Sequence, residues 1–352
     1  MNSLTIAILS IFGYNVADGG SHRGGKMKKY LVLIVSALLL LSGCGSQGSD
    51  EPVVTTKAYK VGTGVVTTVE TTDATAEDLG TVSVNTTYAW IVLDADGVIV
   101  YAKLDTVQNN KATFDNTGVV VDEVYKASKA QLMEEYGMAS ASPISKEWYQ
   151  QVSFMEEWMV GMNIDDVLAT ELADGYATDT DLLTGTTIHI SDFIAALTDA
   201  NSKLVDVNDV VSVGADTYTT ASFAAGKIEF DTNSALVALD VDGNVLYTNI
   251  DVVQSKIAFD ETGVVSAATS NSKKMLGDDY GMVSASAISK EWYQQAEAFE
   301  MWTVGQSIDA VVMTELADGY ATDADLLTGT TINISSIVMA VDAANKAVIT
   351  LS

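Results

Sequence analysis

The sequence predicts an α+β fold with two tandem homologous domains, each an antiparallel sheet with helices packed on one face. Three observations lead to this prediction. The chain repeats itself, and within each copy strand-like runs come before helical periodicity, the order typical of α+β architecture. With 48% apolar residues, the chain can also bury packed cores.

The internal repeat is long and well preserved. Asp94–Gly97 reads Asp-Ala-Asp-Gly and matches Asp240–Gly243, which reads Asp-Val-Asp-Gly. About three quarters of the positions in 136–188 are identical to those in 280–332. The period far exceeds the roughly 20 to 50 residues of solenoid repeats. We therefore expect two domains, each able to hold its own core.

The first part of each copy is rich in β-formers. Tyr88 to Leu93 and Val98 to Tyr101 are joined by Asp-Gly, which predicts a hairpin. The second copy repeats this pattern with Ala235 to Leu239 and Val245 to Tyr247. The Asp-x-Asp-Gly turn also resembles the opening of a calcium loop, but the remaining ligand positions and the closing Glu are missing. We therefore interpret it as a turn.

Helical periodicity follows the strands. An apolar stripe at i, i+4, i+7 and i+11 predicts a helix that packs on the core, and its members are Trp148, Val152, Met155 and Met159. Ser145 and Ser289 are the expected N-caps of this helix in the two copies. Trp158 and Trp302 lie off the stripe and are candidates for a ring near a ligand. A further helix is expected at 188–197, with Ser191 as its cap.

The charge and the rare residues exclude several functions. A net charge of −29, from 47 acidic and 18 basic residues, repels nucleic acid, so no nucleic-acid partner is expected. His189 is matched by Asn333, and Cys44 is the single cysteine, so no Cys/His metal site or thiol–imidazole dyad recurs in the two copies. No Ser/His/Asp set recurs either. We predict no metal site and no catalytic residues.

The amino-terminal region reads as an export signal. Lys28 and Lys29 precede an apolar run from Tyr30 to Leu41, which is too short for the ~20 residues of a membrane span. The run ends in Leu-Ser-Gly-Cys, which resembles a bacterial lipobox with Cys44 as the acylated residue. We expect translation to start at Met27, so that residues 1–26 are not translated or are disordered and 27–43 are the lipoprotein signal peptide.

The rest of the chain divides at the repeat. Residues 44–55 contain a Gly/Ser-rich stretch that predicts a flexible tether. Residues 56–203 form the first predicted domain and 204–352 the second, with the border near Asn201 to Asn208. A lipid anchor on a short tether would hold both domains at the outer face of the cell membrane.

The most distinctive stretch is a polar loop that occurs twice. Residues 177–188 and 321–332 are identical except that Thr180 becomes Ala324. Each copy offers acidic residues, a glycine and a run of hydroxyls just before a predicted helix start. Free N–H groups and the helix dipole favour a phosphate at such a place. We therefore expect a phosphate-bearing group, rather than a metal, to be the guest.

The loops Asp181–Thr187 and Asp325–Thr331 resemble the Asp-x-x-[Ser/Thr]-Gly-Ala-[Ser/Thr] signal of FMN-binding domains. Such domains occur in the C subunit of sodium-pumping NADH:quinone reductase and in the G subunit of Rnf complexes. With its lipobox and two such domains, the chain is similar to the flavinylated lipoproteins of Gram-positive extracellular electron transfer. The resemblance covers nearly all of the mature chain.

The resemblance implies FMN esterified through its phosphate to the last hydroxyl of each loop, Thr187 and Thr331, by a separate FAD:protein FMN transferase. The other implied cofactor-binding residues are Asp181, Thr184, Gly185 and Thr186, with Asp325, Thr328, Gly329 and Thr330 in the second copy. Two departures are notable. Thr186 and Thr330 replace the usual Ala, so they remain alternative acceptors, and Leu182 and Leu326 stand where Gly is frequent.

We also consider eight residues as walls for the flavin ring. They are Leu182, Leu183, Trp148 and Tyr176, with their counterparts Leu326, Leu327, Trp292 and Tyr320. A ring held in such a wall would have its reduction potential set by the protein.

The resulting expectation is a redox carrier rather than an enzyme with its own substrate pocket. It would hold two covalent FMN groups and relay electrons from a membrane quinol oxidoreductase to ferric iron or other extracellular acceptors. The alternative is a non-redox binding or adhesive surface lipoprotein with duplicated acidic domains. That alternative predicts a colourless protein in which the threonines can be replaced without effect on partner binding.

Overall fold

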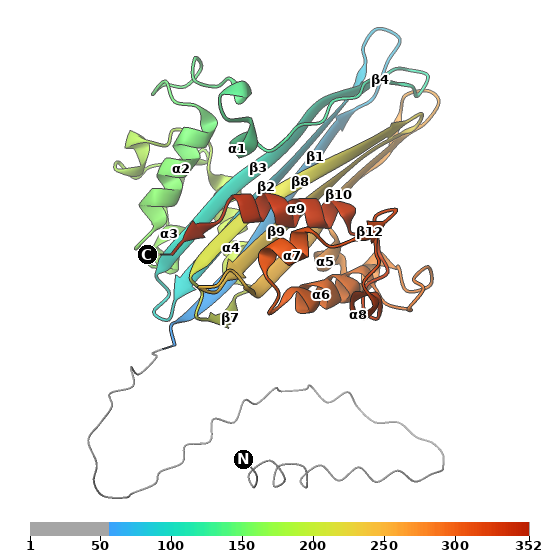
Figure 1. Cartoon of the computed structure of the whole chain (residues 1–352). Coiled ribbons are helices and arrows are strands. Elements are labelled where there is room, and N and C mark those ends of the chain that lie inside the picture. Colours follow the sequence, from blue (N-terminus) through green and yellow to red (C-terminus); the bar gives the residue numbers. More distant parts are fainter. Residues whose placement is uncertain (1–55, 352) are drawn as a thin grey trace, which may run out of the picture. The chain divides into compact units, whose positions relative to one another are not determined.

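The first copy forms a five-stranded antiparallel sheet (Figure 1). The computed structural model describes residues 56–351. Four strands form a meander, and a fifth returns after the helices to pair with β1, giving the order β4-β3-β2-β1-β7. The strands are β1 (Ala58–Thr72), β2 (Gly80–Asp94), β3 (Ile99–Phe114), β4 (Val120–Asp122) and β7 (Val205–Asn208).

The second copy repeats this topology in the order β11-β10-β9-β8-β14. Its strands are β8 (Ser212–Ala224), β9 (Lys227–Leu239), β10 (Val245–Phe259), β11 (Val265–Ser272) and β14 (Ile349–Thr350). The predicted Asp-Gly hairpins are present as β2–β3 and β9–β10. The predicted α+β class with two antiparallel sheets is therefore confirmed.

Helices and two short hairpins fill the chain between the last meander strand and the returning strand. The first copy contains α1 (Lys129–Leu132), η1 (Met133–Tyr136), α2 (Trp148–Met159), α3 (Ile164–Leu168), β5 (Leu172–Ala173), β6 (Tyr176–Ala177), η2 (Leu182–Thr184) and α4 (Ser191–Asn201). The second contains α5 (Lys273–Leu276), η3 (Gly277–Tyr280), α6 (Trp292–Thr303), α7 (Ile308–Val312), β12 (Leu316–Ala317), β13 (Tyr320–Ala321), α8 (Ala324–Leu327) and α9 (Ser335–Lys346).

Strand β2 is buried on both faces, which explains its continuous apolar run. Successive side chains of a strand point to opposite faces. Ile91 and Leu93 therefore pack under the helices, in one cluster with the α2 stripe. Trp90 and Val92 point the other way, into a cluster with residues of the second sheet such as Leu236. Each sheet thus has one helix-covered face and one face turned toward the other sheet.

The two copies share the core between their sheets. The rings of Phe114 and Phe259 stack with their centroids 3.9 Å apart, and the N–H of Ala74 donates to the carbonyl of Gly263 over 2.8 Å. Each copy therefore has a core of its own between its sheet and its helices. The core between the two sheets contains residues of both copies. The described residues 56–351 belong to one compact unit.

The structure places the helix caps differently from the sequence patterns. Strand β7 pairs with β1, so the first sheet ends at Asn208, the last residue of the predicted border region 201–208. The predicted cap Ser145 has a left-handed backbone with φ 53°, and Glu147 is the N-cap of α2. Its carboxylate accepts the N–H groups of Met138 and Ala139 at 2.7 and 3.0 Å, which fastens the preceding loop.

The other predicted caps change in the same way. Glu291 replaces Ser289 as the N-cap of α6. Ser191 is the first residue of α4 rather than its cap, and its hydroxyl lies 3.0 Å from Nδ1 of His189. The predicted signal peptide at 27–43, the predicted acylation site Cys44, the segment 1–26 and the predicted tether at 44–55 lie outside the described residues.

Candidate functional site

The repeated polar loop lies between the short hairpin and the last helix of each copy. Leu182 and Leu326 anchor it, because their side chains are buried in the helix-covered cores. The carboxylates of Asp179 and Asp323 accept the N–H groups of these leucines, both at 2.8 Å. Leu182 and Leu326 therefore fix each loop to the core of its copy.

The two adjacent threonines of each loop have different environments. Thr186 is 1% exposed, and its hydroxyl donates to the backbone carbonyl of Gln151 at 2.6 Å. Thr187 is partly exposed, and its N–H and hydroxyl both donate to Gln151 Oε1, at 2.8 and 3.1 Å. One threonine hydroxyl is therefore committed to the interior, and its neighbour lies at the surface.

The second copy repeats this geometry closely. Thr330 is buried, and its hydroxyl donates to the carbonyl of Gln295 at 2.7 Å. The N–H and hydroxyl of Thr331 donate to Gln295 Oε1 at 2.8 and 3.1 Å. The arrangement survives although the helices beneath the loops differ at several positions, such as Phe154 against Ala298.

Gln151 and Gln295 are site residues that the sequence patterns did not single out. Both are fully buried on α2 and α6. The Gln151 side-chain amide donates to Ser142 Oγ at 3.0 Å and to the carbonyl of Lys146 at 3.2 Å. A neutral amide can orient a hydroxyl, but it cannot take its proton. The available signal was the identical Trp-Tyr-Gln-Gln run in both copies.

The remaining loop residues have structural roles. A Cβ on Gly185 would lie 2.1 Å from the Phe154 ring, so glycine allows the loop to touch α2. The hydroxyls of Thr184 and Thr328 donate to the backbone carbonyls of Asp181 and Asp325, both at 2.7 Å. The Asp181 and Asp325 side chains are exposed. The structure thus brings all ten predicted site residues into two equivalent loops, with different accessibility.

Of the eight residues predicted to contact a flavin ring, four are buried and four are exposed. Leu182, Trp148, Leu326 and Trp292 are buried in the cores, so they offer no open surface. The accessible members are Leu183, Tyr176, Leu327 and Tyr320, with exposed fractions of 36%, 47%, 38% and 47%. The edge of Tyr176 meets His189 with 5.3 Å between ring centroids. An accessible leucine and tyrosine therefore flank each loop.

A groove runs beside each loop and contains the off-stripe tryptophan. In the first copy it is lined by Trp158, Met162, Asp166, Ala169, Thr170, Glu171, Thr178 and Asp179. In the second it is lined by Trp302, Gln306, Ala310, Thr314, Glu315, Thr322 and Asp323. Each groove pairs an indole with two or three carboxylates and no basic side chain. Such a groove suits a neutral or cationic ring better than a phosphate.

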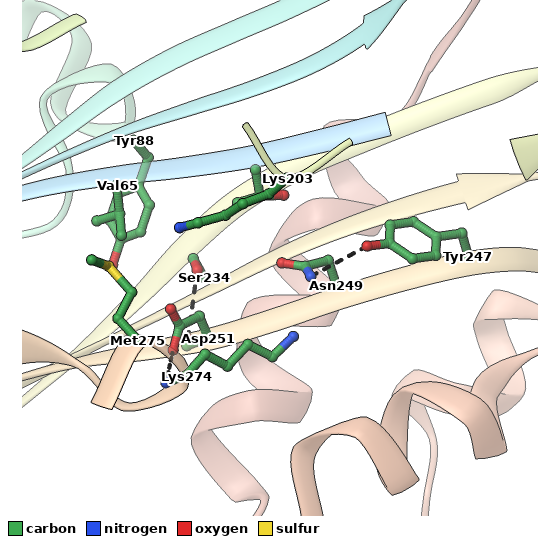
Figure 2. A pocket seen from close by; sticks show the side chains of 10 residues that line it. Val65, Tyr88, Lys203, Ser234, Tyr247, Asn249, Asp251, Lys274 and Met275 are labelled. Carbon is green, nitrogen blue, oxygen red and sulfur yellow. Dashed lines mark hydrogen bonds between the residues drawn. The ribbon is translucent and has the colours of Figure 1, made fainter. Parts of the chain in front are cut away.

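A separate cleft lies between the two copies (Figure 2). Lys203 comes from the first copy, and Tyr247, Asn249 and Lys274 come from the second. Asn249 donates to the Tyr247 hydroxyl at 3.3 Å. None of the predicted site residues lines this cleft, so it is distinct from both loops.

Within residues 56–351, no group of three or more His, Cys, Asp and Glu side chains is placed to hold a metal ion. No helix in this described range is long and apolar enough to cross a membrane. The fold and the loops define a class, namely a duplicated α+β protein that presents one orientated threonine hydroxyl per copy. Comparisons with protein-family models, with curated proteins and with solved structures find no match.

Proposed function

We propose that the chain is a lipid-anchored extracellular electron carrier with two FMN groups, joined by phosphoester bonds to Thr187 and Thr331. The proposal follows the resemblance of the two loops to FMN-attachment signals. The structural observation that supports it best is the paired geometry, in which each copy holds one partly exposed threonine hydroxyl on a buried glutamine. A purely structural loop would not need the same accessible hydroxyl twice.

The structure also favours one of the two acceptor threonines in each loop. An attacking hydroxyl must reach the phosphorus of the donor, and the buried hydroxyls of Thr186 and Thr330 face backbone carbonyls. The hydroxyls of Thr187 and Thr331 are partly exposed and need only leave a neutral amide oxygen. This accessibility supports Thr187 and Thr331 over the alternatives. Attack of the hydroxyl on the FMN phosphorus of FAD would form the phosphoester, break the pyrophosphate bond and release AMP. The FAD:protein FMN transferase would activate the weak nucleophile by taking up its proton.

The surroundings fit a phosphate on one side of the loop. Lys146 and Lys290 belong to the glutamine network, since their backbone carbonyls accept from Gln151 and Gln295 at 3.2 Å. Lys146 Nζ lies 5.2 Å from the centroid of the Phe154 ring, against which Gly185 packs. Lys146 would face the phosphate, and the exposed Leu183 and Tyr176 would contact the ring. The bound flavin would supply the electron-transfer chemistry.

The partners follow from this proposal. A membrane quinol oxidoreductase would donate the electrons, and ferric iron or other extracellular acceptors would take them. Two carriers in one unit would shorten the path for an electron between the donor and an acceptor outside the cell. The shared inner core would keep the two sites at a fixed separation.

The test is co-production with a flavin transferase. The protein should be yellow and carry two FMN increments by intact mass. Thr187→Ala should remove one increment, and the Thr187→Ala, Thr331→Ala double variant should remove both. Retention of both increments in the double variant would refute the attachment sites. A colourless wild-type protein would favour the alternative, a non-redox binding lipoprotein.

A further inference from the structure

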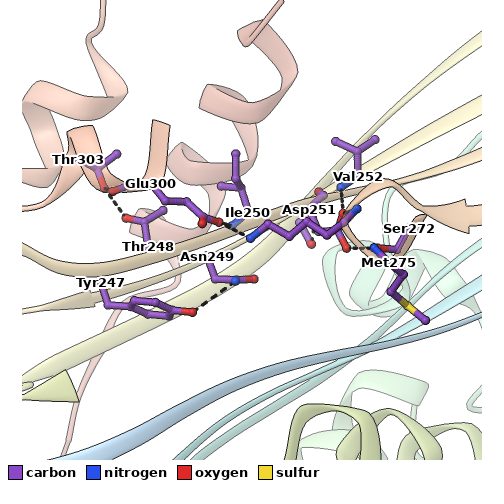
Figure 3. A network of polar contacts seen from close by, with 12 residues as sticks. Tyr247, Thr248, Asn249, Ile250, Asp251, Val252, Ser272, Met275, Glu300 and Thr303 are labelled. Atoms are coloured by element: carbon purple, nitrogen blue, oxygen red, sulfur yellow. Dashed lines mark hydrogen bonds and ion pairs between the residues drawn. The ribbon is translucent and has the colours of Figure 1, made fainter. Parts of the chain in front are cut away.

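The two copies differ around a largely buried carboxylate on α2 and α6. Glu156 and Glu300 occupy equivalent positions, and each accepts the N–H of a strand residue, Leu104 at 2.7 Å and Ile250 at 2.6 Å. In the second copy, Lys274 Nζ lies 2.5 Å from Glu300 Oε1. Figure 3 shows Glu300 beside Ile250 in this polar network. The second copy therefore neutralises its carboxylate with its own lysine.

The first copy lacks that lysine. Ala130 is the counterpart of Lys274, because both follow a lysine stacked on the equivalent tryptophan, and their N–H groups donate to Asp105 and Asp251. A pocket of about 140 Å³ opens where the lysine side chain would lie. It is lined by Lys103, Leu104, Ala130, Met133, Trp148, Tyr149, Val152, Ser153 and Glu156. Its walls combine apolar surface with one carboxylate and one lysine.

We propose that this pocket binds a primary alkylammonium group, which takes the place beside Glu156 that the Lys274 side chain holds beside Glu300. The second copy shows that such a group fits this framework. An alkyl stem would contact Trp148, Val152 and Met133, and the ammonium would pair with the carboxylate. The net charge of −29 would also draw cations toward the protein. This inference does not depend on the flavin proposal.

Lys103 is the internal competitor for the carboxylate. It lines the same pocket from β3, and its counterpart in the second copy is Asn249. In the described part of the chain, no ion pair within 4.0 Å joins it to Glu156. Burial raises the pKa of Glu156 to about 7, with Asp105 and Glu157 raising it further and Lys103 and the Leu104 N–H opposing. A bound ammonium would relieve this penalty.

The probe for the test is n-propylamine, because it contains the four heavy atoms by which lysine exceeds alanine. The purified chain is titrated at pH 8, where Glu156 is ionised, and the amide signals of Leu104 and Ile250 are followed by NMR. We expect the Leu104 signal to shift with saturation and the Ile250 signal to stay. Neutral n-propanol, a probe of the same shape, should move neither signal.

Matched variants make the test specific. Ala130→Lys should abolish the Leu104 shift, since it fills the pocket as in the second copy. Lys274→Ala should create a second site, so that Ile250 responds as well. Lys103→Asn should tighten binding several-fold by removing the competitor. A wild type and a Lys103→Asn variant whose Leu104 signals both stay unchanged would overturn the proposal, as would equal shifts of Leu104 and Ile250 in the wild type.

The source of the ammonium can be separated in the same assay. A blocked Gly-Lys-Gly peptide that displaces n-propylamine, while its ε-acetylated form does not, would assign the pocket to lysine side chains of a polypeptide. Binding of n-propylamine without competition by the peptide would assign it to small free amines. If the Lys274→Ala variant does not fold, the Ala130→Lys and Lys103→Asn variants still decide the question.

Discussion

The hydroxyl of Thr187 donates to the side-chain oxygen of Gln151 over 3.1 Å, on an amide that is itself fully buried. The backbone carbonyl of the same glutamine receives the hydroxyl of Thr186. One residue therefore holds two neighbouring hydroxyls in opposite situations, one inside and one at the surface. Gln295 holds Thr330 and Thr331 in the same way in the second copy. In both copies, a glutamine on the long helix therefore connects that helix to the polar loop.

Valine replacements should separate the two threonines. Valine keeps the shape of threonine but lacks the hydroxyl. Thr186→Val should lower the free energy of unfolding by about 1 to 2 kcal/mol, because the carbonyl of Gln151 loses its buried donor. It should keep both FMN increments. Thr187→Val should remove one increment with a smaller loss of stability. Intact mass and urea unfolding measure both, and loss of the increment in Thr186→Val alone would reverse the assignment.

The glutamine itself should be required for loading. Gln151→Met keeps a similar volume but leaves the Thr187 N–H and hydroxyl without their acceptor. We expect a loss of about 2 kcal/mol in the free energy of unfolding and a large decrease in occupancy of the first site. The second site, on Gln295, provides the control within the same molecule. Full loading of both sites in Gln151→Met would show that the glutamine has no part in positioning the acceptor.

The internal repeat and the hydrophobic periodicity predicted the fold class and the polar loop. They did not predict the side-chain contacts that hold the loop and the helix starts in place. The stripe from Trp148 to Met159 is buried as expected, since an apolar face at helical spacing has few other places to go. The role of Gln151 depends on a contact with a residue 36 positions away, which no local pattern encodes. The N-cap Glu147 was missed for the same reason, because its partners lie in the preceding loop.

The shared inner core was the main feature of the fold that local patterns could not predict. A fully apolar run such as Tyr88 to Leu93 indicates burial on both faces, but not which surface provides the cover. Here the cover is the sheet of the other copy. Duplication made two independent domains the natural expectation, and the packing of sheet on sheet is a long-range property of the whole chain.

The inner core leads to a prediction about cooperativity. Phe114→Ala and Phe259→Ala should each lower the free energy of unfolding by about 3 to 5 kcal/mol, as expected for a buried ring. Because the two rings stack on each other, the double variant should lose less than the sum of the single effects. We also expect one unfolding transition for both copies in guanidinium, followed by tryptophan fluorescence. Two separate transitions would mean that the copies fold independently.

The glycine of the loop should be needed more in the first copy than in the second. Gly185→Ala would place a methyl group 2.1 Å from the Phe154 ring, and Gly329→Ala would place one 2.6 Å from the Cβ of Ala298, so both substitutions force a shift and the larger shift is in the first copy. We expect the first substitution to cost about 1 to 3 kcal/mol and the second to cost less. Phe154→Ala should remove most of the extra cost of Gly185→Ala in a double-mutant cycle. Equal costs at the two glycines would contradict the contact.

The carboxylates on α2 and α6 should respond oppositely to amide replacement. The pKa of Glu156 is raised from its ordinary value of 4.5 to about 7. The folded state therefore binds the proton more tightly than the unfolded state does, and stability falls as the pH rises from 4.5 through 7. Glu156→Gln removes this effect. Its free energy of unfolding should match the wild type near pH 4.5 and exceed it by about 1 to 3 kcal/mol above pH 7.

Burial also raises the pKa of Glu300, with Lys274 opposing. Glu300→Gln should nevertheless destabilise the protein above pH 7, because it leaves the partly buried ammonium of Lys274 without its carboxylate. The pKa of nearby Asp105 is also raised, to about 6, so it titrates in the same pH window. Asp105 is unchanged in both variants, however, and its contribution largely cancels when each is compared with the wild type. Urea unfolding at pH 5 and pH 8 gives the difference in free energy of unfolding between each of the two variants and the wild type at each pH. Changes of the same sign in the two variants at pH 8 would show that Glu156 is compensated in the folded protein and would weaken the case for an ammonium site beside it.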